Sequence, residues 1–123
     1  MALTKAAVTI LASVAVAAGS TKASPGQTGT SVNCTAYHGG EIGWKATNGS
    51  SAPAAPVSIT LQVSHDGTAW YDYYTITGDT AASGVTSGAV LLDRGVMYLR
   101  AIAYGNTTNP VTVELYLQAV TAV

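Results

Sequence analysis

The residues best suited to binding chemistry are aromatic and lie together in one short segment. In SHDGTAWYDYYT, from Ser64 to Thr75, an Asp-Gly pair is followed by one tryptophan and three tyrosines. Aromatic side chains combine a large apolar surface with specific geometry, so they can stack on a ligand or anchor a protein contact. A sugar-stacking surface and a protein-contact surface look the same in a sequence. The candidate binding residues here are Trp70, Tyr71, Tyr73 and Tyr74.

The same segment also predicts a tight β-hairpin. An Asp-Gly pair is among the commonest two-residue hairpin connections, because a type I′ turn needs a positive φ at both positions. Gly67 has no Cβ to clash in that conformation, and the Ser64 hydroxyl can hydrogen-bond within the turn. We therefore assign a structural, turn-forming role to Ser64, Asp66 and Gly67, with Trp70 capping the edge of the core.

No other set of residues predicts a catalytic or metal centre. Cys34 is the only cysteine, and its alternating surroundings are typical of a small buried side chain. His38 and His65 lie in or beside glycine-containing turns without the spacing of a metal site. The six acidic residues form neither a calcium loop nor a specific acid/base pair. We therefore expect a protein that is not an enzyme and that has no metal and no cofactor.

The charge content limits the possible partners. Only 9% of the residues are charged, and the formal net charge is −1, whereas about 25% of the residues are charged in typical soluble domains. The five basic residues are dispersed and form no patch that could neutralise nucleic-acid phosphates, so nucleic-acid binding is not expected. A surface with so little charge is poorly protected against association. It is typical of a chain that works in an assembly, or of a neutral outer face in a harsh medium.

The first 18 residues allow two interpretations. Lys5, an apolar stretch and an Ala-Val-Ala site resemble a secretory signal. The apolar residues also alternate at period two and are often β-branched, which favours a strand. The apolar run from Ala6 to Ala18 is shorter than the ~20 residues of a membrane helix, so no membrane span is expected. We expect a strand with two apolar faces, which is a candidate inter-subunit contact arm. Its candidate contact residues are Val8, Ile10, Val14 and Val16.

The rest of the chain predicts short strands separated by turn signals. Loops are expected at 19–29 and 49–56, where glycine, proline and polar residues gather. The alternation is clearest in 57–64 and 111–120, each with one apolar face. About eight strands of this spacing predict an all-β, single-domain antiparallel β-sandwich of jelly-roll type over residues 1–123. The expected strands are 7–17, 30–37, 41–48, 57–64, 70–77, 84–92, 96–104 and 111–120.

Two segments together carry a resemblance to known families. SHDGTAWYDYYT (64–75) and RGVMYLRAIAYGN (94–106) resemble the hairpin and a later strand of discoidin-like β-sandwich domains, which include many carbohydrate-binding modules. With the N-terminal alanine/valine strand and the loop TNGSSAPAAP (47–56), they are also similar to a group of small structural proteins of tailed bacteriophages. The first likeness covers part of the chain, and the second covers nearly all of it.

The phage resemblance implies a virion structural protein. Its first form is a capsid decoration or cement protein bound outside the shell of the major capsid protein, and its second is a tail, neck or baseplate component. It implies a homo-oligomer, with a trimer favoured, assembled in the host cytoplasm with other virion proteins. The N-terminal strand and loop 49–56 are then the expected contact elements. The discoidin resemblance instead implies a carbohydrate-binding module for host-surface glycans.

Overall fold

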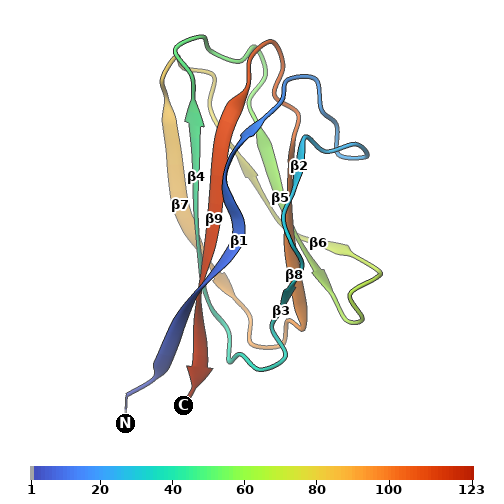
Figure 1. Ribbon diagram of the computed structural model, residues 1–123, viewed down its shortest axis with the longest axis vertical. Coiled ribbons are helices and arrows are strands. Elements are labelled where there is room, and N and C mark those ends of the chain that lie inside the picture. Colours follow the sequence, from blue (N-terminus) through green and yellow to red (C-terminus); the bar gives the residue numbers. More distant parts are fainter. Residues whose placement is uncertain (1) are drawn as a thin grey trace.

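A computed structural model describes residues 2–123. Two antiparallel sheets pack face to face, and no helix occurs among the described residues, which confirms the predicted all-β sandwich (Figure 1). The strands in this part of the chain are β1 (Thr4–Val16), β2 (Gln27–Thr28), β3 (Val32–Asn33), β4 (Gly40–Asn48), β5 (Ser58–Ser64), β6 (Tyr71–Thr77), β7 (Val85–Leu92), β8 (Tyr98–Tyr104) and β9 (Val111–Ala122).

The strand order follows the pattern of a jelly roll. One sheet has the order β1-β9-β4-β7 and the other the order β2-β8-β5-β6, with β3 also paired to β8. The first strand pairs with the last, β2 and β3 pair with β8, β4 pairs with β7, and β5 pairs with β6. This nested pairing is one long hairpin wrapped into two sheets, so the start of β1 and the end of β9 lie together at one end (Figure 1).

The core lies between the sheets and follows the predicted alternation. In β9, Val111, Val113, Leu115 and Leu117 are buried, while Thr112 and Tyr116 are exposed. In β5 the apolar face is buried as predicted, but the polar face is buried as well, through Thr60, Gln62 and Ser64. The largest fully buried side chains are Ile10, Ile42, Ile59, Leu61, Leu99, Leu115 and Leu117.

Strand β1 departs from the expected simple alternation. Its register against β9 shifts between Thr9 and Leu11 and again between Leu11 and Val14. These irregularities put both Ile10 and Leu11 in the core, whereas Ala12 is exposed. The strand is therefore not a simple alternation with two equivalent apolar faces. One side of β1 completes this chain's own core, and the small residues on the other side are exposed.

The predicted strand at 30–37 is also wrong in its extent. Only β3 is regular there, and β2 forms inside the predicted loop. The Asn33 side chain ends β3 because its Oδ1 accepts the amide of Thr35 at 3.0 Å, in competition with the ladder. Gly29 lies between β2 and β3, and its amide still donates to the Ala101 carbonyl at 2.8 Å. The two short strands thus act as one interrupted strand along β8, which restores the predicted eight.

A glycine substitution tests the close packing of β1 on this interrupted strand. A Cβ at Gly29 would lie 2.4 Å from the Ile10 carbonyl oxygen, whereas a Cβ at Gly43 would have no neighbour within 4 Å. We expect Gly29→Ala to lower the free energy of unfolding by about 1–3 kcal/mol, because backbone must move. The matched variant Gly43→Ala should leave it equal or higher. Urea denaturation measures both, and equal midpoints would contradict the packing.

Candidate functional site

The connection between β5 and β6 is longer than the predicted two-residue turn. It spans residues 65–70, and Gly67 alone among them has a positive φ, of 78°. The buried Ser64 Oγ accepts the amides of Gly67 at 2.8 Å and of Asp66 at 3.2 Å. The predicted type I′ turn is therefore wrong, because Asp66 does not take the left-handed conformation. Side-chain hydrogen bonds shape this loop.

The Asp66 carboxylate organises the second half of the loop. Its Oδ1 accepts the amide of Thr68 at 2.8 Å and that of Ala69 at 2.9 Å. The amides of Ala69 and Thr68 favour the ionised form and lower the pKa of Asp66 to about 2. The carboxylate is thus committed to the backbone, which leaves it a structural role.

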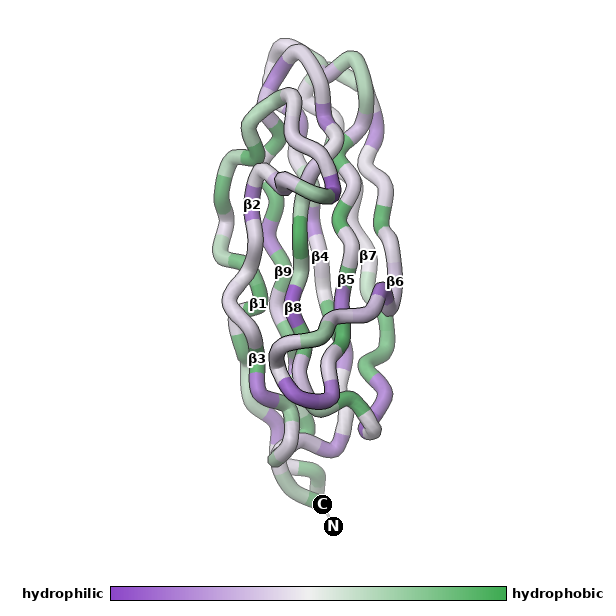
Figure 2. The backbone as a smooth tube through the Cα atoms, turned by 90° about the vertical axis from the view of Figure 1, so that its right-hand side faces the viewer, coloured by the Kyte–Doolittle hydropathy of each residue, from purple (hydrophilic) through white to green (hydrophobic). Residues whose placement is uncertain are grey.

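Trp70 lies on the outer face of the β5–β8 sheet, and the prediction that it caps the core edge is wrong. The Arg100 guanidinium lies over its ring, 4.3 Å from the centroid. Arg100 Nε donates to Gln62 Oε1 at 2.9 Å, and Gln62 Nε2 donates to Asp72 Oδ1 at 3.1 Å. Asp72 forms an ion pair with Lys22, which lowers the pKa of Asp72. This polar row crosses three strands, and the β5–β6 connection folds across the front of the sheet (Figure 2).

Two of the three tyrosines are accessible. Tyr71 is 56% exposed, and its ring stacks with that of His65 at a centroid distance of 6.2 Å. Tyr74 is 49% exposed on the same edge strand. An open depression of about 420 Å³ begins beside Tyr71 and is lined also by Val63, Ser64, His65, Tyr73, Asp93, Gly95, Val96 and Met97. Its aromatic wall can hold a ring-shaped ligand, whereas Tyr74 lies outside it.

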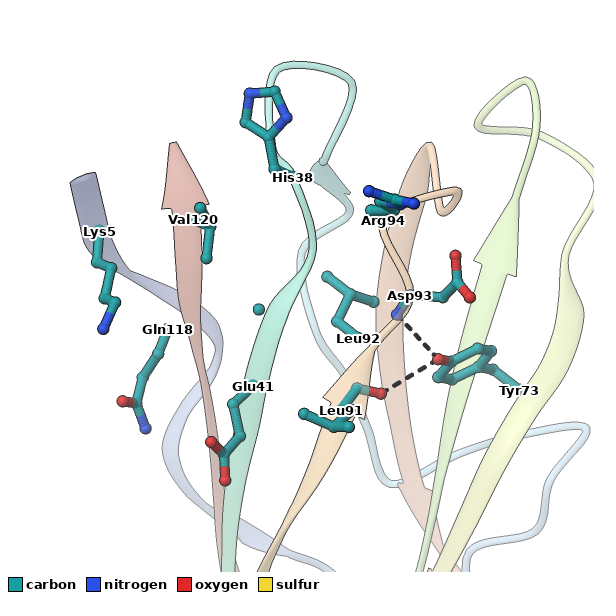
Figure 3. Close-up of a pocket in the computed structure, with 11 residues that line it drawn as sticks. Lys5, His38, Glu41, Tyr73, Leu91, Leu92, Asp93, Arg94, Gln118 and Val120 are labelled. Carbon is teal, nitrogen blue, oxygen red and sulfur yellow. Dashed lines mark hydrogen bonds between the residues drawn. The ribbon is translucent and has the colours of Figure 1, made fainter. Parts of the chain in front are cut away.

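Tyr73 connects the two sheets. It packs against the core, and its hydroxyl donates to the Leu91 carbonyl and accepts the Asp93 amide, both at 3.2 Å (Figure 3). These two backbone groups lie at the end of β7, so Tyr73 fixes that end of the edge strand to β6. Of the predicted aromatic residues, Tyr73 therefore has a structural task.

A second, larger depression of about 660 Å³ lies near the chain termini (Figure 3). Its rim carries charged groups of both signs, and no ion pair among residues 2–123 joins them. Within these residues, no three histidine, cysteine, aspartate or glutamate side chains are close enough to hold a metal ion. The polar residues around it are Lys5, His38, Glu41, Asp93, Arg94 and Gln118.

The predicted contact residues of the N-terminal strand face the interior. Ile10 and Val16 are buried in the core of this chain, and Val8 and Val14 pack against it. Ile10 and Val16 are therefore committed to this chain's own core, whereas Val8 and Val14 are only partly buried. Cys34 is buried as well, and burial raises the pKa of its thiol to about 11, which opposes the thiolate that a nucleophile needs.

Sequence reasoning missed the exposed apolar edge strand β7. It pairs only with β4, so one of its edges is open. Val85 is 54% exposed and Leu91 is 74% exposed. The absence of charge and proline from VTSGAVLL was visible in the sequence. The position of β7 at the edge of a sheet depends on the whole topology and could not be read from the sequence.

The comparisons with known proteins establish the fold. No protein-family model matches the chain, and no curated protein matches it. A protein of the Bacillus endospore appendages, which are described as a novel family of disulfide-linked pili, is similar in structure, with a TM-score of 0.54 and 13% identity over 100% of this chain and 93% of that chain. The SPBc2 prophage-derived protein YomS is similar too, with a TM-score of 0.51 and 13% identity over 96% of each chain. At this identity, the likeness shows a shared sandwich fold.

Residues 2–123 contain no helix with the length and apolar character of a membrane span.

The Asp66 loop predicts a specific pH dependence. The folded-state pKa of about 2 lies below the ordinary value of 3.8. The carboxylate therefore stabilises the fold above pH 4, and this contribution is lost as the pH falls from about 4 to 2. We expect the gap in melting temperature between the wild type and Asp66→Asn to narrow over that range. Thermal unfolding at a series of pH values measures it, and parallel curves would contradict the role of the loop.

Proposed function

We propose that the chain is a virion structural protein that acts through protein–protein contacts. The role we propose first is that of a capsid decoration protein on the outside of the major capsid shell. The alternative is a tail, neck or baseplate component. The observation that carries the proposal is the open edge of β7, which is apolar and uncharged on a surface that has little charge elsewhere. Exposed apolar surface of this kind marks contact sites.

The rest of the surface supports an assembly role. Large apolar side chains are also exposed outside β7, including Met97 on the loop before β8 and Tyr116 on β9. Individually weak contacts of this kind become strong when many copies bind to one particle, because the later contacts form at a high effective concentration. A decoration protein uses this advantage directly.

The two similar folds are compatible with this proposal, and they help to define the type of assembly. One belongs to a protein of an appendage and the other to a prophage-derived protein. The appendage is described as disulfide-linked, whereas Cys34 is the single cysteine here and is buried. A polymer whose subunits are joined by disulfides needs one accessible thiol in each subunit for each of its two neighbours. We therefore propose a non-covalent assembly for this protein.

Carbohydrate binding is the second candidate function. It is favoured by the stacked Tyr71 and His65 rings beside an open depression. We expect Tyr71→Ala to abolish any signal on a glycan array, because it removes the aromatic wall, whereas Tyr74→Ala should retain the signal. An array on which the wild-type protein gives no signal would contradict this candidate.

The virion proposal predicts that the protein is present in purified particles. Particles from a host that produces the protein should contain it at a fixed ratio to the major capsid protein, which quantitative mass spectrometry measures. A copy number comparable with that of the shell protein supports decoration, and a few copies per particle support a tail or neck position. Absence from particles that are otherwise complete would overturn the proposal.

A further inference from the structure

Strand β7 lacks the devices that protect the other sheet edges among residues 2–123. Strand β1 has register shifts and carries Lys5, and β6 has a register irregularity against β5 and carries Asp72. Strands β2 and β3 have two residues each. Strand β7 has eight residues, a continuous register with β4, and neither charge nor proline. Long, regular, uncharged edges are templates for pairing with another strand.

The hydrogen bonds show which backbone groups of β7 point outward. The Gly84 carbonyl accepts the amide of Asn48 in β4, whereas the Leu91 carbonyl and the Asp93 amide bind Tyr73 on the other side. The backbone N–H and C=O groups of successive residues in an antiparallel strand point to opposite sides. In β7 the backbone groups of the odd-numbered residues therefore point away from β4. The outward groups of Val85, Ser87 and Ala89 have no partner strand within residues 2–123.

We propose that a second copy of this chain pairs with β7 in antiparallel orientation, with Ser87 opposite Ser87 on a two-fold axis. Tyr73 sets this register, because its hydroxyl already hydrogen-bonds the Leu91 carbonyl and the Asp93 amide. The part of the edge that is free for a second strand therefore ends at Ala89. Val85 of each copy then lies opposite Ala89 of the other. Each directly opposed, hydrogen-bonded pair exchanges two bonds, so three pairs give about six hydrogen bonds.

A second copy is the occupant that fits this edge best. Two identical antiparallel strands form a closed, self-complementary contact without any further component. An uncharged strand places no like charges opposite each other across the axis. In the row of residues that crosses the sheet at the two-fold axis, the nearest charged residue is Lys45 of β4, which lies opposite Ser87 of β7. The two copies of Lys45 are three strand spacings apart, about 14 Å, which is beyond the ~10 Å screening length at 0.1 M salt.

The proposed contact buries a small area, as expected for one contact among many in a larger assembly. Strand pairing alone covers less than the ~1,600 Å² of a standard stable interface. We therefore expect weak pairing in solution that strengthens when copies are held side by side. The inference goes beyond the proposed function, because it applies whether or not the assembly is a virion. It gives a two-fold contact, whereas the sequence resemblance implies three-fold association.

Cysteine cross-linking tests the register in the purified full-length chain. A hydrogen-bonded pair has a Cα–Cα separation of about 5.5 Å, which a disulfide can bridge. Under mild oxidation, Ser87→Cys should form a covalent dimer at least tenfold faster than Tyr74→Cys, a position on β6 that is also exposed. Val85→Cys and Ala89→Cys should cross-link when mixed and not when alone. The native Cys34 does not interfere, because it is buried.

Two results would overturn the inference. One is a Ser87→Cys chain that cross-links no faster than Tyr74→Cys. The other is cross-linking of Val85→Cys with Leu91→Cys in preference to Ala89→Cys, which would reject the register set by Tyr73.

A proline variant gives an independent measurement. Ser87→Pro removes only an outward amide, which an edge strand tolerates, so its melting temperature should stay close to that of the wild type. Sedimentation at increasing concentration should show dimers of the wild type and of Ser87→Thr, and monomers of Ser87→Pro. A wild type that stays monomeric at millimolar concentration, or a dimeric Ser87→Pro, would reject pairing through β7. Neither result depends on whether the protein is found in particles.

Discussion

The pairing of β1 with β9 is the interaction on which the rest of the structure depends. It brings the beginning and the end of the chain together and places β9 between β1 and β4, where both of its edges are paired. Ile10 and Val16 complete the core from β1. The fully buried Asn106 secures one end of the pair, because its side-chain amide donates to the carbonyls of Val16 at 3.0 Å and Asn109 at 2.9 Å.

This pairing also decides which edges remain open. Once β1 covers β9, the four-stranded sheet has β1 at one edge and β7 at the other. The irregular register of β1 makes it a poor template, whereas β7 is regular. Tyr73 then covers the end of β7 from the other sheet and leaves its middle open. The open edge of β7 thus follows from the topology together with one hydroxyl group.

The sequence predicts those strands in which the alternation of apolar and polar residues continues along the whole paired segment. Strands β4 and β9 are of this kind, since their apolar positions alternate without interruption. Prediction fails where side chains compete with the ladder, as Asn33 does at the end of β3 and Asp66 does in the β5–β6 loop. It also fails for Trp70, which lies in the β5–β6 connection and whose ring packs under Arg100 of β8. Such distant contacts leave no periodic signal in the sequence.

The same reasoning separates the candidate functions. A monomeric sugar-binding module gains nothing from an unprotected strand edge and risks aggregation through it. A single lysine on the outward-facing positions of β7 would remove that risk with little effect on the fold, yet Val85, Ser87, Ala89 and Leu91 are all uncharged. In an assembled protein the same edge is useful, because it provides backbone hydrogen bonds without needing a matched set of side chains. The unprotected edge therefore supports the proposal of an assembly role over that of ligand binding.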